Sequence, residues 1–387
     1  MVYRWWKVLL CTLMNKDIPM LDLEIYLNSV KVLRVYNELP KYMADANNWL
    51  FNRVQPISRA SLVNMLKNCG INNIEQYDYS MYAISVTDTY WIKPFDKDLS
   101  WDDINPHKNS LSKLASKYIL NGIYDDIDLK LPSPDYRLDG TAEKFLKHVN
   151  GKLCLYKTNG ETYGGEFRYA GIRPYCEYYA NQVIKALEVP DIEYVKYRIN
   201  AKRLNEYEVK PYVCCDSFTN DDTGFIPIEN TIFKDCDIKE LLYRTNGQNR
   251  ETLLNMVMID AITVNIDRHT ENYGFTVDNN TLKLKGIAPI FDMDCSLGAI
   301  TPLYDTNENK QRAFERGLWT IQRNNRFGFS DFISQGKSVL NTLNFKSRLK
   351  NMYPFHFKRL PKDIDLPDGR IQFMEYIVNS QIKNILS

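Results

Sequence analysis

The chain has 387 residues, a length that predicts more than one packed unit rather than a single core. Apolar residues make up 44% and charged residues 25%, as in ordinary globular proteins, and no run approaches the roughly 20 apolar residues that a membrane span needs. The formal net charge is +1, so no broad electrostatic field attracts nucleic acid or an anionic membrane, and we expect neither as a direct partner.

Cysteine and histidine usage argues against a zinc site and against an oxidising compartment. The eight cysteines form no C-x-x-C pair, and the chain has only four histidines. We interpret the cysteines as reduced, mostly buried thiols and expect a cytoplasmic protein. The apolar run at residues 1–17 is interrupted by Lys7 and has no small-residue cleavage site, which disfavours a secretory signal.

Residues 1–130 are predicted to form an N-terminal unit with mixed secondary structure. Residues 21–37 and 82–95 alternate in the manner of strands, and residues 58–71 have the serine cap and glycine stop of a helix. No cluster of ionisable side chains stands out in this unit. A role in packing, or in recognition of a partner or substrate, is therefore favoured over catalysis.

Residues 131–220 are predicted to form a second unit, after a boundary rich in proline and glycine at 131–140. The pair Asn150-Gly151 is the dipeptide best suited to a type I′ turn, so a β-hairpin is expected around it. In its second strand, alternation puts Lys157 on the same face as two leucines. Lys157 should therefore point toward packed structure.

A helix should follow this hairpin, beginning near Pro174 and carrying Glu177 in its first turn. Residues 192–201 and 206–218 then have the pattern of a second pair of strands.

Residues 221–387 are predicted to be mostly helical. Helices are expected at 238–246 and 249–265, a short hairpin with a turn at 278–280, and an amphipathic helix at 367–387.

The stretch VNIDRHTENYGF, residues 264–275, gathers two carboxylates, an imidazole, a guanidinium and two carboxamides between apolar flanks. A zinc site is disfavoured, because no other histidine is placed to help His269. A plain polar turn is an alternative, since these residue types cluster in loops for backbone reasons. Against it, Asp267 is followed by Asn272 five residues later and by Asp292 beyond the hairpin, which is the pattern of a protein-kinase active site.

In such a site each residue type has a chemical reason. Asp267 would accept or orient the proton of the attacking hydroxyl, while Asn272 and Asp292 would offer the hard oxygen ligands that Mg²⁺ prefers. Lys157, with Glu177 twenty residues later, fits the lysine–glutamate pair that positions ATP phosphates. Taken alone, the first is more often a surface lysine and the second a helix-dipole residue, but their order ahead of the Asp–Asn–Asp set favours the kinase interpretation.

The motifs NIDRHTEN and PIFDMD resemble those of the HipA-like kinases, the serine/threonine kinase toxins of bacterial toxin–antitoxin modules. The resemblance covers about residues 131–387. It implies an α+β, protein-kinase-like bilobal fold, with a β-rich small lobe at 131–220 and a mostly helical large lobe at 221–387, joined to an N-terminal α/β subdomain at 1–130. The segment SPDYRLDGTAEKF also looks like the family's nucleotide loop, which here would consist of Gly140, Thr141, Ala142, Glu143 and Lys144.

The resemblance also implies roles for individual residues. His269 would support the catalytic loop or approach the phosphates, and backbone groups near Cys215 and Asp216 would read adenine as the hinge. Thr141 is the candidate for autophosphorylation, because members of the family phosphorylate a hydroxyl in the nucleotide loop and so silence the kinase. The chain departs from the family in having one glycine in this loop and an N-terminal region that does not match.

The sequence thus predicts an ATP- and Mg²⁺-dependent serine/threonine protein kinase that modifies a protein hydroxyl and itself. The alternatives are a kinase-fold phosphotransferase for a lipid or another small molecule, and a pseudokinase that binds nucleotide without catalysis. An antitoxin partner, a role as a toxin and delivery as an effector are left open by the sequence.

Overall fold

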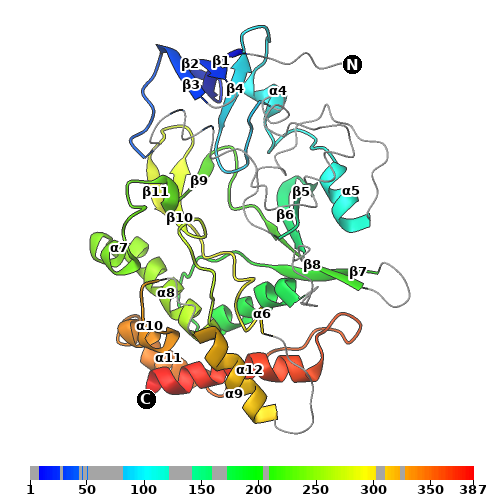
Figure 1. Cartoon of the computed structure of the whole chain (residues 1–387), viewed down its shortest axis with the longest axis vertical. Helices are drawn as coiled ribbons and strands as arrows, with labels where there is room; N and C mark the ends of the chain where they lie inside the picture. Colours follow the sequence, from blue (N-terminus) through cyan, green and yellow to red (C-terminus); the bar gives the residue numbers. More distant parts are fainter. Residues whose placement is uncertain are drawn as a thin grey trace.

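The computed structural model describes residues 8–26, 29–42, 46, 50, 82–121, 142–158, 172–203, 209–301, 310–322 and 327–387. Within these ranges the chain has mixed α and β structure, with three antiparallel sheets and a helical region. In Figure 1 the first sheet lies at the top, the other two sheets lie below it, and most of the helices gather in the lower part.

The N-terminal sheet has the strand order β3-β2-β1-β4. Its strands are β1 (Leu9–Asn15), β2 (Ile18–Tyr26), β3 (Ser29–Val35) and β4 (Tyr90–Pro94). The single alternating run predicted at 21–37 is wrong in detail, because it contributes to two paired strands. The strand predicted at 82–95 is shorter than expected. The helix predicted at 58–71 lies outside the described residues.

The middle sheet has the order β5-β6-β8-β7. Its strands are β5 (Lys144–Val149), β6 (Lys152–Thr158), β7 (Arg198–Arg203) and β8 (Val209–Asp216). The hairpin predicted at Asn150-Gly151 is confirmed, and both residues have the positive φ that a type I′ turn requires (50° and 77°). The strand predicted from residue 192 begins later, at Arg198.

Helix α6 (Ile172–Ala186) packs against the middle sheet and corrects the predicted helix start. It includes two residues before Pro174, which is tolerated there because backbone N–H groups of the first turn need no helical partner. Glu177 is therefore the sixth residue of α6 and belongs to its second turn rather than to its first.

The third sheet has the order β11-β10-β9 and lies beside the helical region. It consists of β9 (Thr223–Pro227), β10 (Gly274–Asp278) and β11 (Leu284–Ile287). The hairpin predicted after the polar stretch is confirmed as β10 and β11.

The helical region is built around α8 (Gly247–Thr263), whose residues from Thr252 onward are all buried. The helix packs against α6, α7 (Ile238–Arg244), α10 (Phe332–Val339) and α12 (Asp368–Leu386). Helices α9 (Lys310–Gln322) and α11 (Phe345–Met352) pack on α12. The predicted helices at 238–246, 249–265 and 367–387 are thus confirmed, with slightly different ends.

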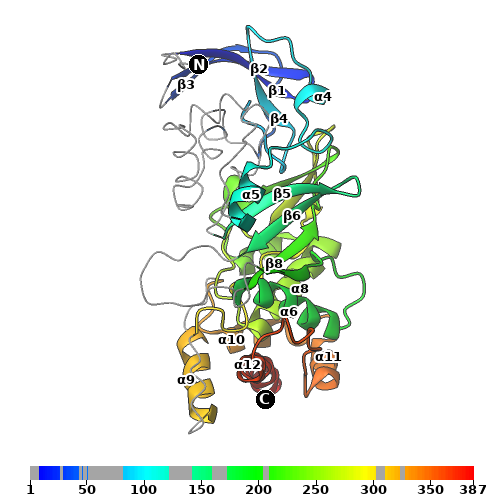
Figure 2. The same cartoon turned by 90° about the vertical axis from the view of Figure 1, so that its right-hand side faces the viewer.

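The N-terminal unit contacts both other sheets. Short helices α4 (Trp101–Ile104) and α5 (Leu114–Asn121) follow β4, and α5 packs on β5 (Figure 2). The backbone N–H of Phe225 in β9 donates to the carbonyl of Thr87 at 2.6 Å. These contacts join the N-terminal unit to the middle and third sheets.

No helix among the described residues combines the length and apolarity that crossing a membrane would require. The seven described cysteines are free, and five of them are buried.

Candidate active site

Lys157 lies on the inner face of β6, where the middle sheet meets α6. Its side chain is only 5% exposed, which agrees with the direction predicted from the alternation in β6. The Nζ atom donates to Glu177 Oε2 at 2.8 Å and to Asp292 Oδ1, and it lies 3.4 Å from Asp294 Oδ2. One buried ammonium therefore contacts three carboxylates that lie far apart in the sequence.

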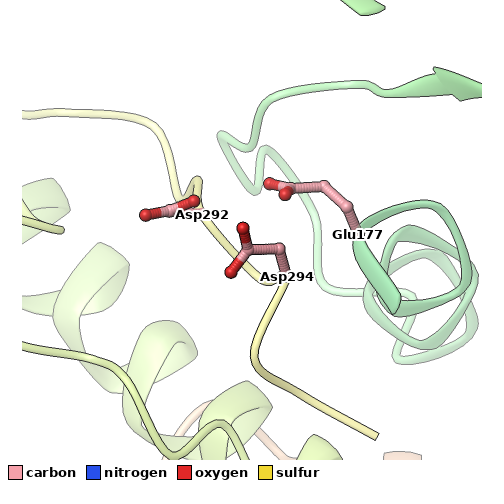
Figure 3. A group of neighbouring side chains, drawn as sticks. All are labelled: Glu177, Asp292 and Asp294. Atoms are coloured by element: carbon pink, nitrogen blue, oxygen red, sulfur yellow. The ribbon is translucent and has the colours of Figure 1, made fainter. Parts of the chain in front are cut away.

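The three carboxylates form what we call the acidic cluster, Glu177, Asp292 and Asp294. One ligand oxygen from each residue lies within 4.8 Å of the other two, a spacing that a single metal ion could bridge. Figure 3 shows them converging, with Glu177 on helix α6 and both aspartates on the segment that follows β11. Carboxylate oxygens are the ligands that Mg²⁺ prefers, so the donor set fits this ion.

Ion pairs set the protonation states of Lys157 and Asp292, whereas burial raises the pKa of Glu177. Burial by itself would lower the pKa of Lys157, but Asp292, Asp294 and Glu177 outweigh it and raise that pKa well above its usual value. Burial likewise opposes ionisation of Asp292, yet Lys157, Lys144 and Arg268 hold its pKa well below the usual range. Lys157 is therefore an ammonium and Asp292 a carboxylate at neutral pH.

The backbone on either side of Asp292 is tightly held. Asp292 has a φ of +58°, in the left-handed region that residues other than glycine rarely adopt. The next residue, Met293, donates its N–H to Glu177 Oε1 at 3.2 Å. Glu177 thus binds Lys157 with one oxygen and the Asp292 segment with the other.

The polar stretch after α8 forms a compact loop. The N–H of His269 donates to the carbonyl of Asp267, and the N–H of Asn272 donates to the carbonyl of His269, both at 2.9 Å. The Nδ2 of Asn272 also donates to the Asp267 carbonyl at 2.9 Å, which leaves Oδ1 as the atom chemically suited to bind a cation. His269 is half-buried and lies beside Glu271, 3.4 Å between Nδ1 and Oε2.

The predicted nucleotide loop is described only in part. Gly140 and Thr141 lie outside the described residues, and Ala142 is buried. Glu143 forms an ion pair with Lys210 at 3.0 Å, so its side chain contacts this lysine rather than Lys157. Lys144, in contrast, stands directly opposite Lys157 in the β5–β6 pair and shares its face of the sheet.

The predicted hinge lies at the end of β8. Cys215 is buried and stands opposite Leu155, on the inner face that carries Lys157. The side chain of Asp216 lies on the other face, where it pairs with Arg198 at 2.7 Å, and this contact lowers its pKa. Any role of Asp216 in reading adenine is thus restricted to its backbone.

Sequence reasoning missed two charged residues near this group, Asp294 and Arg173. Asp294 follows Asp292 by two positions, so the spacing D-x-D was the available signal. Arg173 lies one helical turn before Glu177 on α6, and although burial opposes its charge, Asp294, Cys295, Asp267 and Asp292 raise its pKa. Arg173 had no signal in the sequence, because its proximity to these carboxylates arises only from the fold.

Comparison with known proteins gives one weak sequence similarity. No family model matches the chain. A segment of 134 residues is 26% identical to "Serine/threonine-protein kinase CtkA" of Helicobacter pylori. The match covers 30% of this chain and 38% of the relative, so the chain aligns with well under half the length of that kinase.

Among solved structures, the chain aligns with the "Crystal structure of A Helicobacter pylori proinflammatory kinase CtkA". The alignment covers 63% of this chain and 91% of the other at 18% identity, with a TM-score of 0.41, which is too low to assign a shared fold. The comparisons thus give weak similarity to a serine/threonine kinase in sequence, which makes a kinase-like protein the coarse expectation.

Proposed function

We propose that this chain is an ATP- and Mg²⁺-dependent serine/threonine protein kinase of the HipA-like type. The observation that carries the proposal is the contact of Lys157 with both Glu177 and Asp292, next to the Asp267–Asn272 loop. A strand lysine paired with a helix glutamate, together with an Asp–Asn pair and a second Asp, is the set that phosphoryl transfer from ATP requires. Weak similarity to a curated serine/threonine kinase supports the same class.

Each of these residues would have a different role in phosphoryl transfer. Lys157, held by Glu177, would orient the ATP phosphates, and Asp267 would accept the proton of the attacking hydroxyl. Asp292 and Asn272 would hold Mg²⁺, which when bound neutralises charge on the phosphoryl group. In the bilobal arrangement that we propose, the middle sheet and α6 form the small lobe, and the region around α8 forms the large lobe.

The test is intact-mass spectrometry of the purified chain after incubation with ATP and Mg²⁺. We expect the wild type to gain one or more phosphates and Asp292→Ala to gain none. Asp235→Ala is the matched control, because Asp235 is an exposed aspartate between β9 and α7 that belongs neither to the acidic cluster nor to the Asp267–Asn272 loop, and it should behave as the wild type. A wild type that binds Mg²⁺ and ATP but gains no phosphate, and modifies no protein added to it, would contradict the proposal and favour a small-molecule phosphotransferase.

Autophosphorylation at Thr141 is a separable part of the proposal. A phosphate there would add a charge of about −1.5 to −2 to a loop that holds ATP phosphates, so it would oppose nucleotide binding. Thr141→Ala should remove one phosphopeptide and prolong activity. An unchanged phosphopeptide map would assign self-regulation to another residue.

A further inference from the structure

Arg268, in the Asp267–Asn272 loop, and Asp260, in helix α8, form a buried ion pair next to the candidate active site. The Arg268 side chain is 2% exposed and that of Asp260 is fully buried. Arg268 Nε donates to Asp260 Oδ2 at 2.9 Å, and Nη2 donates to Oδ1 at 3.2 Å. This is the bidentate geometry that a planar guanidinium forms with a carboxylate.

The remaining Arg268 nitrogen joins two segments that carry proposed metal ligands. Nη1 donates to the carbonyl of Asn272 at 2.7 Å and to the carbonyl of Phe291 at 2.6 Å. The first carbonyl belongs to a proposed ligand itself, and the second belongs to the residue before Asp292. One guanidinium therefore fixes the distance between the two segments.

Asp260 also reaches the proposed catalytic base through a second path. Its Oδ1 accepts a hydrogen bond from Asn265 Nδ2 at 3.0 Å. Asn265 Oδ1 in turn accepts from the N–H of Asp267 at 3.2 Å. Asp260, in the buried helix α8, is thus connected by hydrogen bonds to Asp267, Asn272 and the Asp292 segment without itself belonging to the site.

The backbone conformation of Asp292 explains why contacts are needed on both sides of this residue. A left-handed φ at a residue other than glycine costs energy, and it persists where neighbouring contacts determine the backbone. Arg268 holds the carbonyl just before Asp292, and Glu177 holds the N–H just after it. Replacing a buried ion pair with well-packed apolar residues is often neutral or stabilising. A net gain in folding free energy therefore does not explain why the chain has the Arg268–Asp260 pair.

We propose that the Arg268–Asp260 pair is the positioning device of this site, which sets Asn272 and Asp292 at the separation required to bind one divalent cation. The proposal rests on the proposed kinase function for its catalytic meaning. The metal geometry can be tested without catalysis. Lysine cannot replace Arg268, because an ammonium lacks the planar fork that reaches a carboxylate and two carbonyls together.

The experiment measures Mn²⁺ affinity by electron paramagnetic resonance, with and without ATP, in the wild type and in Arg268→Lys. We expect Mn²⁺ binding to weaken about tenfold or more in Arg268→Lys, as residues that orient metal ligands typically do when changed. In the transfer assay the Mg²⁺ concentration for half-maximal rate should rise by a similar factor, while the KM for the protein substrate stays unchanged.

Two further variants separate positioning from general damage to the fold. Asp260→Asn, which alters a residue outside the site, should reproduce the weaker Mn²⁺ binding. Arg348→Gln is the matched control, because Arg348 also donates to backbone carbonyls (Leu343, Leu187 and Glu188) but lies in the α11 region. It should lower thermal stability and leave Mn²⁺ affinity as in the wild type.

The outcomes distinguish this proposal from the proposed function. Wild-type Mn²⁺ affinity and Mg²⁺ requirement in folded Arg268→Lys would overturn the positioning role. A wild type that binds Mn²⁺ in an Arg268-dependent way but transfers no phosphate would refute the kinase function and keep the positioning role. A wild type that binds no Mn²⁺, with or without ATP, would overturn both.

Discussion

Two regions contribute to the proposed chemistry: Lys157 with the acidic cluster, called the Lys157 cluster below, and the Asp267–Asn272 loop. Different kinds of contact hold the two regions together. The cluster joins residues from β6, from α6 and from the segment after β11 through ionic contacts. The loop consists of six consecutive residues held by short backbone and side-chain hydrogen bonds. Long-range charge organises the first region, and local hydrogen bonding organises the second.

This difference teaches which part of the site can change its partners. An ammonium and a metal ion compete for the same carboxylate oxygens, so a bound Mg²⁺ would compete with Lys157 for Asp292. The loop's own hydrogen bonds offer no such exchange, because they join backbone and amide groups rather than carboxylates that a cation could bind. We therefore expect changes at Lys157 and Asp292 to alter cation and nucleotide binding, and a change at Asp267 to alter the rate of transfer.

The largest contrast is expected between Asp267→Ala and Asp292→Ala. Loss of a general base typically lowers a rate about 10²- to 10⁴-fold, so Asp267→Ala should abolish measurable transfer while Mg²⁺-dependent ATP binding persists. Asp292→Ala should lose both. Nucleotide titration followed by fluorescence, run beside a transfer assay, measures the two effects, and equal binding by both variants would break the comparison.

Lys157→Met tests the exchange of partners in the cluster. Removing one partner of a buried ion pair costs about 3–5 kcal/mol, because the carboxylates are left uncompensated. We expect lost transfer, a lower Tm, and a rise in Tm with added Mg²⁺ that exceeds the rise in the wild type. A Tm that does not respond to Mg²⁺ would show that the acidic cluster holds no cation.

The dependence of stability on alkaline pH also tests the ion pairs of Lys157. The folded pKa of Lys157 is raised above its unfolded value of about 10.4, so its contribution is fully present below that pH and is lost as pH rises through the folded pKa. The difference in unfolding free energy between the wild type and Lys157→Met should therefore stay constant from neutral pH to about pH 10. Denaturant titrations across this range measure it, and an earlier decline would contradict the ion pairing.

Gly274→Ala probes the junction between the loop and the hairpin that leads to Asp292. A Cβ at this position would lie 2.7 Å from Pro227 Cα in β9, and backbone atoms of a paired strand cannot move aside cheaply. We expect a loss of about 1–3 kcal/mol in unfolding free energy, as overpacking usually causes. Gly286→Ala serves as a comparison, because its Cβ would meet only the end of the Asn249 side chain.

Lys16→Ala should have the smallest effect. Lys16 donates to Asn280 Oδ1 at 2.7 Å and lies 3.8 Å from carboxylate oxygens of Asp221 and Asp222, linking the N-terminal sheet to the β10–β11 turn. Partly exposed ion pairs contribute about 0.2–1 kcal/mol, so stability should fall slightly and transfer should be unchanged. A large loss of transfer would instead give the N-terminal unit control over the hairpin.

Local patterns in the sequence determined much of this architecture. The Asn-Gly pair specified the β5–β6 hairpin, alternation specified the inward direction of Lys157, and helical periodicity specified α8 and α12. These predictions succeeded because turn chemistry and side-chain periodicity act between residues that are close along the chain. The predicted first-turn position of Glu177 was wrong, because proline is tolerated within the first turn and so did not mark the first residue of α6.

Only the tertiary structure decided which charges meet. Arg173 and the Arg268–Asp260 pair could not be assigned roles in advance, since nothing local distinguishes them from other charged residues. Lys157 and Asp292 are 135 positions apart, and their contact exists because β6, α6 and the segment after β11 pack together. These buried charges are paired, because an unpaired charge in the interior would carry a desolvation cost larger than the stability of the fold.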